Sequence, residues 1–223
     1  MNDNLTKAIE RAKGYVSKLT SEGLASSGSI DLSKVWQLNE SYITSPVQGG
    51  LVVIDQTRAH QRVLYQEVIK SFELDTSSSQ TLLFPKKLDL EVSKFTALLD
   101  ILPYMNKIGF SITKLEENSV MLESIPSDMP WGNEDVVIFK MLDDFTLALK
   151  KDIPKEESIA LSFSNRACIK HGDTLNRSEM VELINRLFGT DDPYTCPNGQ
   201  RVLYQIPFNE IEKRFNDLGK LLA

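Results

Sequence analysis

The chain of 223 residues is 41% hydrophobic and 25% charged, the composition of a globular protein long enough to bury a core. A formal net charge of −6 gives no overall basic field for a phosphate backbone, so we expect any DNA contact to be weak or indirect. No apolar run approaches the roughly 20 residues that span a bilayer, and the polar N-terminus does not look like a signal peptide, so we expect no membrane contact. Two cysteines, Cys168 and Cys196, favour reduced thiols over a disulfide framework.

The first predicted elements are a leader, two strands and a helix. Residues 1–30 form an amphipathic stretch and the Gly/Ser-rich linker SEGLASSGS, which we expect to precede the fold. Two strands are predicted over 35–43 and 51–54, with the turn at SPVQGG between them. Apolar residues then recur at helical spacing, which predicts a helix over 56–72.

The middle of the chain, residues 73–155, has a self-contained βαββα-like order. Its predicted elements, in chain order, are a strand over 81–92, a helix over 93–109, a hairpin over 110–126 and a helix over 134–150. Pro85 makes the strand irregular or an edge, and Pro103 kinks or ends the first helix. We expect this segment to be an insertion that forms its own lobe.

The last third is predicted to hold helices and one strand. The elements expected are helices over 155–170 and 176–189, a strand over 201–207 and a helix from about 209. Asn176 with Glu179, and Asn209 with Glu212, have the spacing of helix capping boxes. A strand near each end of the chain predicts one sheet that both ends share. The fold class expected is therefore α+β with two subdomains: a discontinuous α/β subdomain over 31–72 and 156–223, and the inserted subdomain over 73–155.

Three short segments carry a resemblance to a known family. They are VVIDQTRAHQRVLYQE, SNRACIKHG and YTCPNGQR, and in this order and spacing they resemble the C-terminal domain of the mismatch-repair protein MutL, from about Asp31 to Phe215. The resemblance implies that the discontinuous subdomain is a dimerisation subdomain, which joins two protomers, and that the inserted subdomain is regulatory. The ATPase head of that family is not expected in this chain. It also implies a bacterial, cytoplasmic, nucleoid-associated protein.

Nuclease-bearing members of the family hold a divalent metal at positions that are largely changed in this sequence. Asp55 and Cys196 keep the ligand types. The other vestigial positions hold Thr57, Gln61, Gln66, Asn165 and Asn198, and Arg58 replaces an alanine. Amides are poor ligands for transition metals, so one carboxylate and one thiol do not suffice. We therefore expect no metal, no cofactor and no catalytic residue, with Cys196 as a residue that packs in its turn.

The alternative is a metal-dependent DNA nicking endonuclease with a degenerate zinc or manganese site. It would use Asp55, Cys196 and either His60 or Glu67, which lie one residue from the family's His/Glu pattern. A shift of one residue turns a helical side chain by roughly 100°, which argues against those two. His171 is expected to be a solvated residue at a helix end, where its charge suits the helix dipole.

The stretch QTLLFP, which begins at Gln80, resembles the short motif by which bacterial repair proteins bind the DNA polymerase sliding clamp. In this interpretation Gln80 contacts the pocket rim, and Leu83 and Phe84 fill an apolar cleft. The alternative is that Leu82, Leu83 and Phe84 form an ordinary buried strand edge.

The remaining partners follow from the resemblance. We expect a homodimer through the shared sheet, in the region of Val35, Val52 and Val202, although pairing with another family member stays open. A MutS-like mismatch recognition protein would be contacted through the full-length protein.

Overall fold

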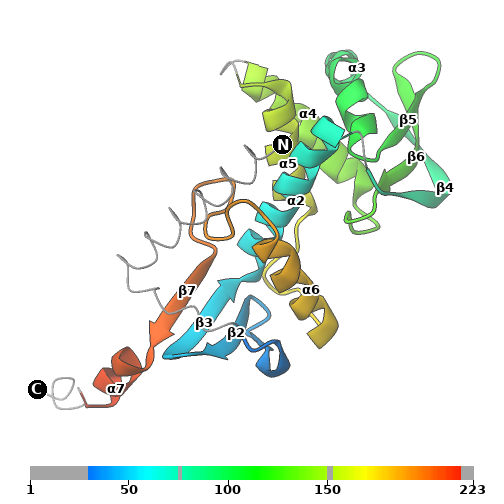
Figure 1. Cartoon of the computed structure of the whole chain (residues 1–223). Coiled ribbons are helices and arrows are strands. Elements are labelled where there is room, and N and C mark those ends of the chain that lie inside the picture. Colours follow the sequence, from blue (N-terminus) through cyan, green and yellow to red (C-terminus); the bar gives the residue numbers. More distant parts are fainter. Residues whose placement is uncertain (1–29, 75–76, 150–152, 217–223) are drawn as a thin grey trace, which may run out of the picture.

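The computed structural model describes residues 30–74, 77–149 and 153–216, so the predicted leader over 1–30 lies almost entirely outside the described residues. The elements in chain order are η1 (Leu32–Lys34), β1 (Trp36–Leu38), β2 (Tyr42–Val47), β3 (Gly50–Asp55), α2 (Gln56–Leu74), β4 (Ser79–Asp89), α3 (Val92–Lys107), β5 (Ser111–Lys114), β6 (Ser119–Pro126), α4 (Glu134–Leu149), α5 (Lys155–Ala167), α6 (Arg177–Phe188), β7 (Leu203–Pro207) and α7 (Phe208–Asn216). Helices and two antiparallel sheets confirm the α+β class (Figure 1).

The first sheet joins the two ends of the described chain. Its strand order is β1-β2-β3-β7, and every neighbouring pair is antiparallel, with Val53 of β3 opposite Tyr204 of β7. The prediction that early and late strands share a sheet is confirmed. Gly50 stands where a Cβ atom would collide with the backbone oxygen of Ile206, so the close approach of β3 and β7 requires glycine there.

Two local predictions at the ends of this sheet are wrong. Residues 35–43 form two strands, because Asn39 and Glu40 adopt left-handed φ values of 49° and 46° and turn the chain between β1 and β2. The first half of SPVQGG then continues β2, since Tyr42–Val47 is one strand. At the other end, α7 begins at Phe208, so Asn209 lies inside the helix and does not cap it.

The first sheet packs with α2 and α6 around one hydrophobic core. We call this the sheet core; its buried members are Val35, Ile43, Val52, Ile54, Ala59, Val63, Met180, Leu183, Ile184, Leu187, Cys196, Val202 and Leu203. Helix α6 starts with the predicted capping box, in which Asn176 and Glu179 each accept a backbone N–H from the other. The four buried residues of α6, Met180, Leu183, Ile184 and Leu187, belong to the sheet core.

The second sheet, of order β4-β6-β5, packs with α3, α4 and α5 around a second cluster, which we call the lobe core. Pro103 lies within α3, which continues to Lys107 before Gly109 turns the chain at φ 105°. The sequence predicts that helix α5 belongs to the discontinuous subdomain over 31–72 and 156–223. In the structure, however, Ile159 and Phe163 of α5 are buried in the lobe core. The subdomain boundaries therefore stay a prediction.

Helix α2 joins the two cores, as its central place in Figure 1 shows. Its first half contributes Ala59 and Val63 to the sheet core, and its second half contributes Leu64 and Val68 to the lobe core. Arg186 of α6 adds an ion-pair bridge, since its guanidinium lies 2.7 Å from Glu67 of α2 and 2.8 Å from Asp128, which follows β6. One long helix and one arginine thus fix the first sheet relative to the inserted lobe.

Candidate functional site

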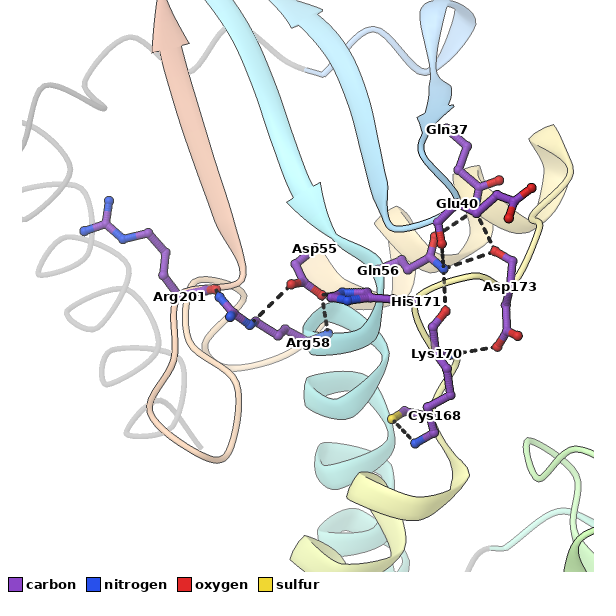
Figure 2. A network of polar contacts seen from close by, with 10 residues as sticks. All are labelled: Gln37, Glu40, Asp55, Gln56, Arg58, Cys168, Lys170, His171, Asp173 and Arg201. Atoms are coloured by element: carbon purple, nitrogen blue, oxygen red, sulfur yellow. Dashed lines mark hydrogen bonds and ion pairs between the residues drawn. The ribbon is translucent and has the colours of Figure 1, made fainter.

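Asp55 ends β3 and directly precedes α2, which places its carboxylate at the start of a long helix. Its Oδ1 accepts the backbone N–H of Arg58 at 3.0 Å and lies 3.1 Å from Nε2 of His171. Its Oδ2 lies 3.3 Å from Nε of Arg58 (Figure 2). Both carboxylate oxygens therefore have nitrogen partners from this chain, and Asp55 is only 7% exposed.

Arg58 connects the start of α2 to the segment just before β7. Its Nη1 donates to the backbone oxygen of Arg201 at 2.9 Å, and the N–H of Asp55 donates to the backbone oxygen of Val202 at 2.9 Å. The guanidinium thus stands between the carboxylate and the late turn. A positive charge therefore lies directly beside the Asp55 carboxylate.

Gln56 is a fully buried polar residue that joins three segments. Its Nε2 lies 2.9 Å from the backbone oxygen of Glu40, 2.7 Å from that of Lys170 and 3.1 Å from that of Asp173 (Figure 2). Its Oε1 accepts from Nε2 of Gln37 at 2.8 Å. Gln56 therefore satisfies the β1–β2 turn and the loop after α5 at once, which is a structural role.

The last turn brings two of the vestigial positions together. Nδ2 of Asn198 donates to Oδ1 of Asn165 at 2.9 Å, so these two amides bond to each other. Cys196 is 1% exposed within the sheet core, and its backbone N–H and C=O bond to Gln200 and Gly199 within the turn. Its thiol points into packed apolar side chains, which is the geometry expected of a turn residue.

The vestigial positions on α2 lie in different surroundings. The hydroxyl of Thr57 is buried, and none of the described residues accepts or donates to it. Gln61 and Gln66 are partly exposed. His60 is buried, and its Nδ1 accepts the backbone N–H of Ile169 at 2.9 Å. Burial lowers the pKa of His60 to about 4, so the ring is neutral at pH 7.

Two residues proposed as substitute ligands or solvated charges have other contacts. The Glu67 carboxylate accepts a hydrogen bond from Arg186. Burial raises the pKa of Glu67 above its ordinary value, and this outweighs the lowering effect of Arg186. His171 is not at a helix end, since α5 stops at Ala167; its ring contacts Asp55 and lies 5.8 Å from the ring of Tyr42. The Asp55–His171 contact was missed because the two residues are 116 positions apart. Over the described ranges, no three His, Cys, Asp or Glu side chains are grouped to bind a metal.

The QTLLF stretch lies on β4, an edge strand whose pairing with β6 shifts between Thr81 and Lys86. Leu82 is buried, whereas Leu83 and Phe84 are 83% and 82% exposed. Gln80 turns inward, and its Nε2 donates to the backbone oxygen of Met129 at 2.7 Å. The expected buried edge therefore holds for Leu82 alone.

The two faces of the first sheet differ in exposure. Val35, Val52 and Val202 lie in the sheet core and are 8%, 5% and 2% exposed, so these three side chains do not face solvent. Among the described residues, the opposite face is mostly apolar and its apolar side chains are exposed or half-exposed, whereas its polar residues Thr44 and Asp55 are buried. We call it the open sheet face; its members are Trp36, Leu38, Tyr42, Leu51, Val53, Tyr204 and Ile206.

Fold and site together define an α+β association domain. It has one open sheet face and a polar group of residues around Asp55, which we call the Asp55 cluster and whose charged groups bond within the chain. Within the described parts of the chain, no helix is long and apolar enough to cross a membrane. Residues 35–175 match the family described as MutL C terminal dimerisation domain, and the chain belongs to that family.

Similar proteins include the DNA mismatch repair protein MutL of Prosthecochloris aestuarii, which is 37% identical over 184 residues, covering 82% of this chain and 30% of that protein. The DNA mismatch repair protein MutL of Chloroherpeton thalassium is 36% identical over 184 residues, covering 81% of this chain and 28% of that protein. The chain therefore spans less than a third of the length of these relatives.

Proposed function

We propose that this chain is the self-association and partner-docking domain of a MutL-like mismatch-repair protein, and that two copies join through the open sheet face. The observation that carries the proposal is this face, which lies on a member of a dimerisation family. Trp36 is 45% exposed and Tyr204 is also 45% exposed, on opposite edges of the sheet. A group of exposed apolar side chains on one face of a globular protein is typical of an interaction site.

Val53 lies on β3, between Thr44 of β2 and Tyr204 of β7. A substitution there therefore tests this surface directly. Val53→Glu would bury two like charges across a twofold interface, and we expect it to raise the dimer dissociation constant by roughly a hundredfold or more. Sedimentation equilibrium measures this, with far-UV circular dichroism to show that the variant is folded. Thr81→Glu, on the exposed side of β4, is the matched control and should leave the dimer intact. A folded Val53→Glu dimer of unchanged affinity would remove the open sheet face from the proposal.

The contacts within the Asp55 cluster support the inference that this domain has no nuclease activity. A divalent cation needs several anionic or imidazole ligands, and the residues present do not fit one. The Asp55 oxygens face Arg58 and His171, while Asn165 and Asn198 bond to each other. We infer that the Asp55 cluster binds neither zinc nor manganese and that the domain has no cofactor of its own.

Plasmid nicking tests this inference against the endonuclease alternative. The chain would be incubated with supercoiled DNA, Mn²⁺ and the polymerase sliding clamp, beside an Asp55→Ala variant. We expect wild type and variant to give the same background of nicked product. Nicking that requires both the clamp and Asp55 would show a working metal site and overturn the inference.

We also infer that Leu83 and Phe84 dock on the polymerase sliding clamp. Their exposure supports the proposal, because a strand edge that served only the fold would turn such large apolar side chains inward. Gln80 contributes by holding the segment in place through the Met129 carbonyl. The double variant Leu83→Ala/Phe84→Ala should weaken clamp binding at least about tenfold in surface plasmon resonance. Val92→Ala, which removes another exposed side chain, should not; equal loss in both would exclude this docking site.

The remaining partners are proposed for the full-length protein. Since this chain covers under a third of its relatives, contact with a MutS-like mismatch recognition protein and ATP turnover would involve the rest of that protein. DNA contact by this domain would be weak, in keeping with the net charge of −6. Arg62 and Arg166 fit this view, because each pairs with an aspartate of the same chain, Asp192 and Asp144 respectively. The full-length protein is expected in the bacterial cytoplasm, associated with the nucleoid.

A further inference from the structure

Helix α7 is amphipathic, yet none of its nine residues is buried, and the structure describes all of them. Phe208, Ile211 and Phe215 are spaced three and four residues apart, so they share one side of the helix. We call them the terminal stripe. Phe208 is 52% exposed and Phe215 is 74% exposed, which leaves two aromatic rings largely in water.

The apolar side of an amphipathic helix needs a packing partner. Most helical stability in proteins comes from burying such a face. Figure 1 shows α7 beyond the end of β7, well away from α3, α4 and α5. The described part of the chain therefore does not provide the cover that the terminal stripe requires.

The terminal stripe continues the open sheet face. The backbone N–H of Phe208 donates to the backbone oxygen of Gly49 at 2.9 Å, which fixes the start of α7 at the β2–β3 turn. The hydroxyl of Tyr204, a member of the open sheet face, lies 3.3 Å from Oε2 of Glu210 in the first turn of α7. These two bonds hold the helix at the rim of that face, so what covers the face is well placed to cover the stripe.

We propose that the terminal stripe packs against a second copy of this chain, so that α7 acts as an arm from one protomer onto its partner. The inference rests on the proposed association of open sheet faces and adds a defined contact at its rim. In a twofold dimer the same patch serves both protomers, and β7 is an edge strand, so two arms would lie at opposite ends of the interface. The charged residues Lys213 and Arg214 would stay in water on the outer side of the arm.

Phe215→Ser tests the arm, with Asn209→Ser on the polar side of α7 as the matched control. Loss of one buried aromatic ring per protomer should raise the dimer dissociation constant at least about tenfold, while the control should change it less than about twofold. Sedimentation equilibrium gives both constants. Equal constants for Phe215→Ser, the control and the wild type would overturn the inference.

A second measurement asks which chain covers the stripe. In a dimer mixed from isotope-labelled and unlabelled chains, we expect nuclear Overhauser contacts between the Phe215 ring of one protomer and apolar side chains of the other. Contacts confined to one chain would overturn the arm. Failure of the proposed function is distinguishable: a folded Val53→Glu that stays dimeric rejects the open sheet face, whereas a monomeric Val53→Glu with an unaffected Phe215→Ser rejects the arm alone.

Discussion

Val53 and Asp55 lie two residues apart on β3, on the same side of the sheet, and their surroundings are opposite. Every charged atom of the Asp55 carboxylate meets a nitrogen of this chain, from Arg58 or His171. The apolar side chains around Val53 are half-exposed or exposed. The charged groups of the Asp55 cluster are paired within one chain, whereas the apolar side chains of the open sheet face are exposed. This is the difference that the proposed association through that face requires.

The same contrast recurs in β4, and it gives the largest expected effect on stability. Leu82→Ala would leave a cavity in the lobe core and should lower the free energy of unfolding by about 2–4 kcal/mol. Leu83→Ala removes a side chain that is 83% exposed and should change it by less than about 0.5 kcal/mol. Urea denaturation measures both, and equal losses would show that Leu83 is part of the fold.

The pH dependence of stability probes the buried contact between His60 and the Ile169 N–H. The pKa of His60 is about 4 in the fold against an ordinary value of 6.5 for a solvated histidine, so unfolding takes up a proton between these values. The ring therefore stabilises the fold fully above about pH 6.5, and about 3 kcal/mol is lost as the pH falls toward 4.

His60→Asn isolates that contribution, because an amide oxygen can still accept the Ile169 N–H without titrating. The difference in unfolding free energy between wild type and variant should grow with rising pH across this window. A constant difference would show that His60 is accessible and protonates as readily in the folded state.

Gln56 comes next in size. Gln56→Ala would remove a fully buried amide and its bonds to the backbone oxygens of Glu40, Lys170 and Asp173, and we expect a loss of about 2 kcal/mol. Gln66→Ala on the same helix removes a partly exposed amide and serves as control, with a change below about 0.5 kcal/mol. Similar values for the two variants would remove Gln56 from its structural role.

The smallest effect is expected at Asp55 itself. Asp55→Asn keeps an oxygen for the Arg58 N–H but loses the charge that faces Arg58 and His171, both of which are partly exposed. We expect a loss of about 1 kcal/mol, because pairs open to solvent are weak. Thermal unfolding should give the same loss with and without Mn²⁺. A larger loss in Mn²⁺ would mean that Asp55 binds the ion.

Much of the fold could be predicted because it depends on local patterns. Helical spacing gave α2 to within two residues of its end, the Asn176–Glu179 capping box gave the start of α6, and strands near both ends gave the first sheet. The turn at Asn39 and Glu40 was missed because only Asn39 is of a type that readily adopts a left-handed backbone, and neither glycine nor proline marks the turn.

The surroundings of the sites depend on contacts between distant segments, and these the sequence did not reveal. Apolar residues occupy both faces of β3, so alternation cannot tell which face packs inward, and the valines chosen for the interface lie in the sheet core. The sequence does not show which groups Arg58 contacts. Its bond to the Arg201 carbonyl, 143 residues away, helps hold its charge beside Asp55.

Sedimentation equilibrium of the unmodified chain, followed through dilution from tens of micromolar, tests most directly that the open sheet face is a surface for self-association. The account predicts twice the chain mass of 25.2 kDa at the highest concentrations and a concentration-dependent return to the monomer. A folded monomer at tens of micromolar would contradict it.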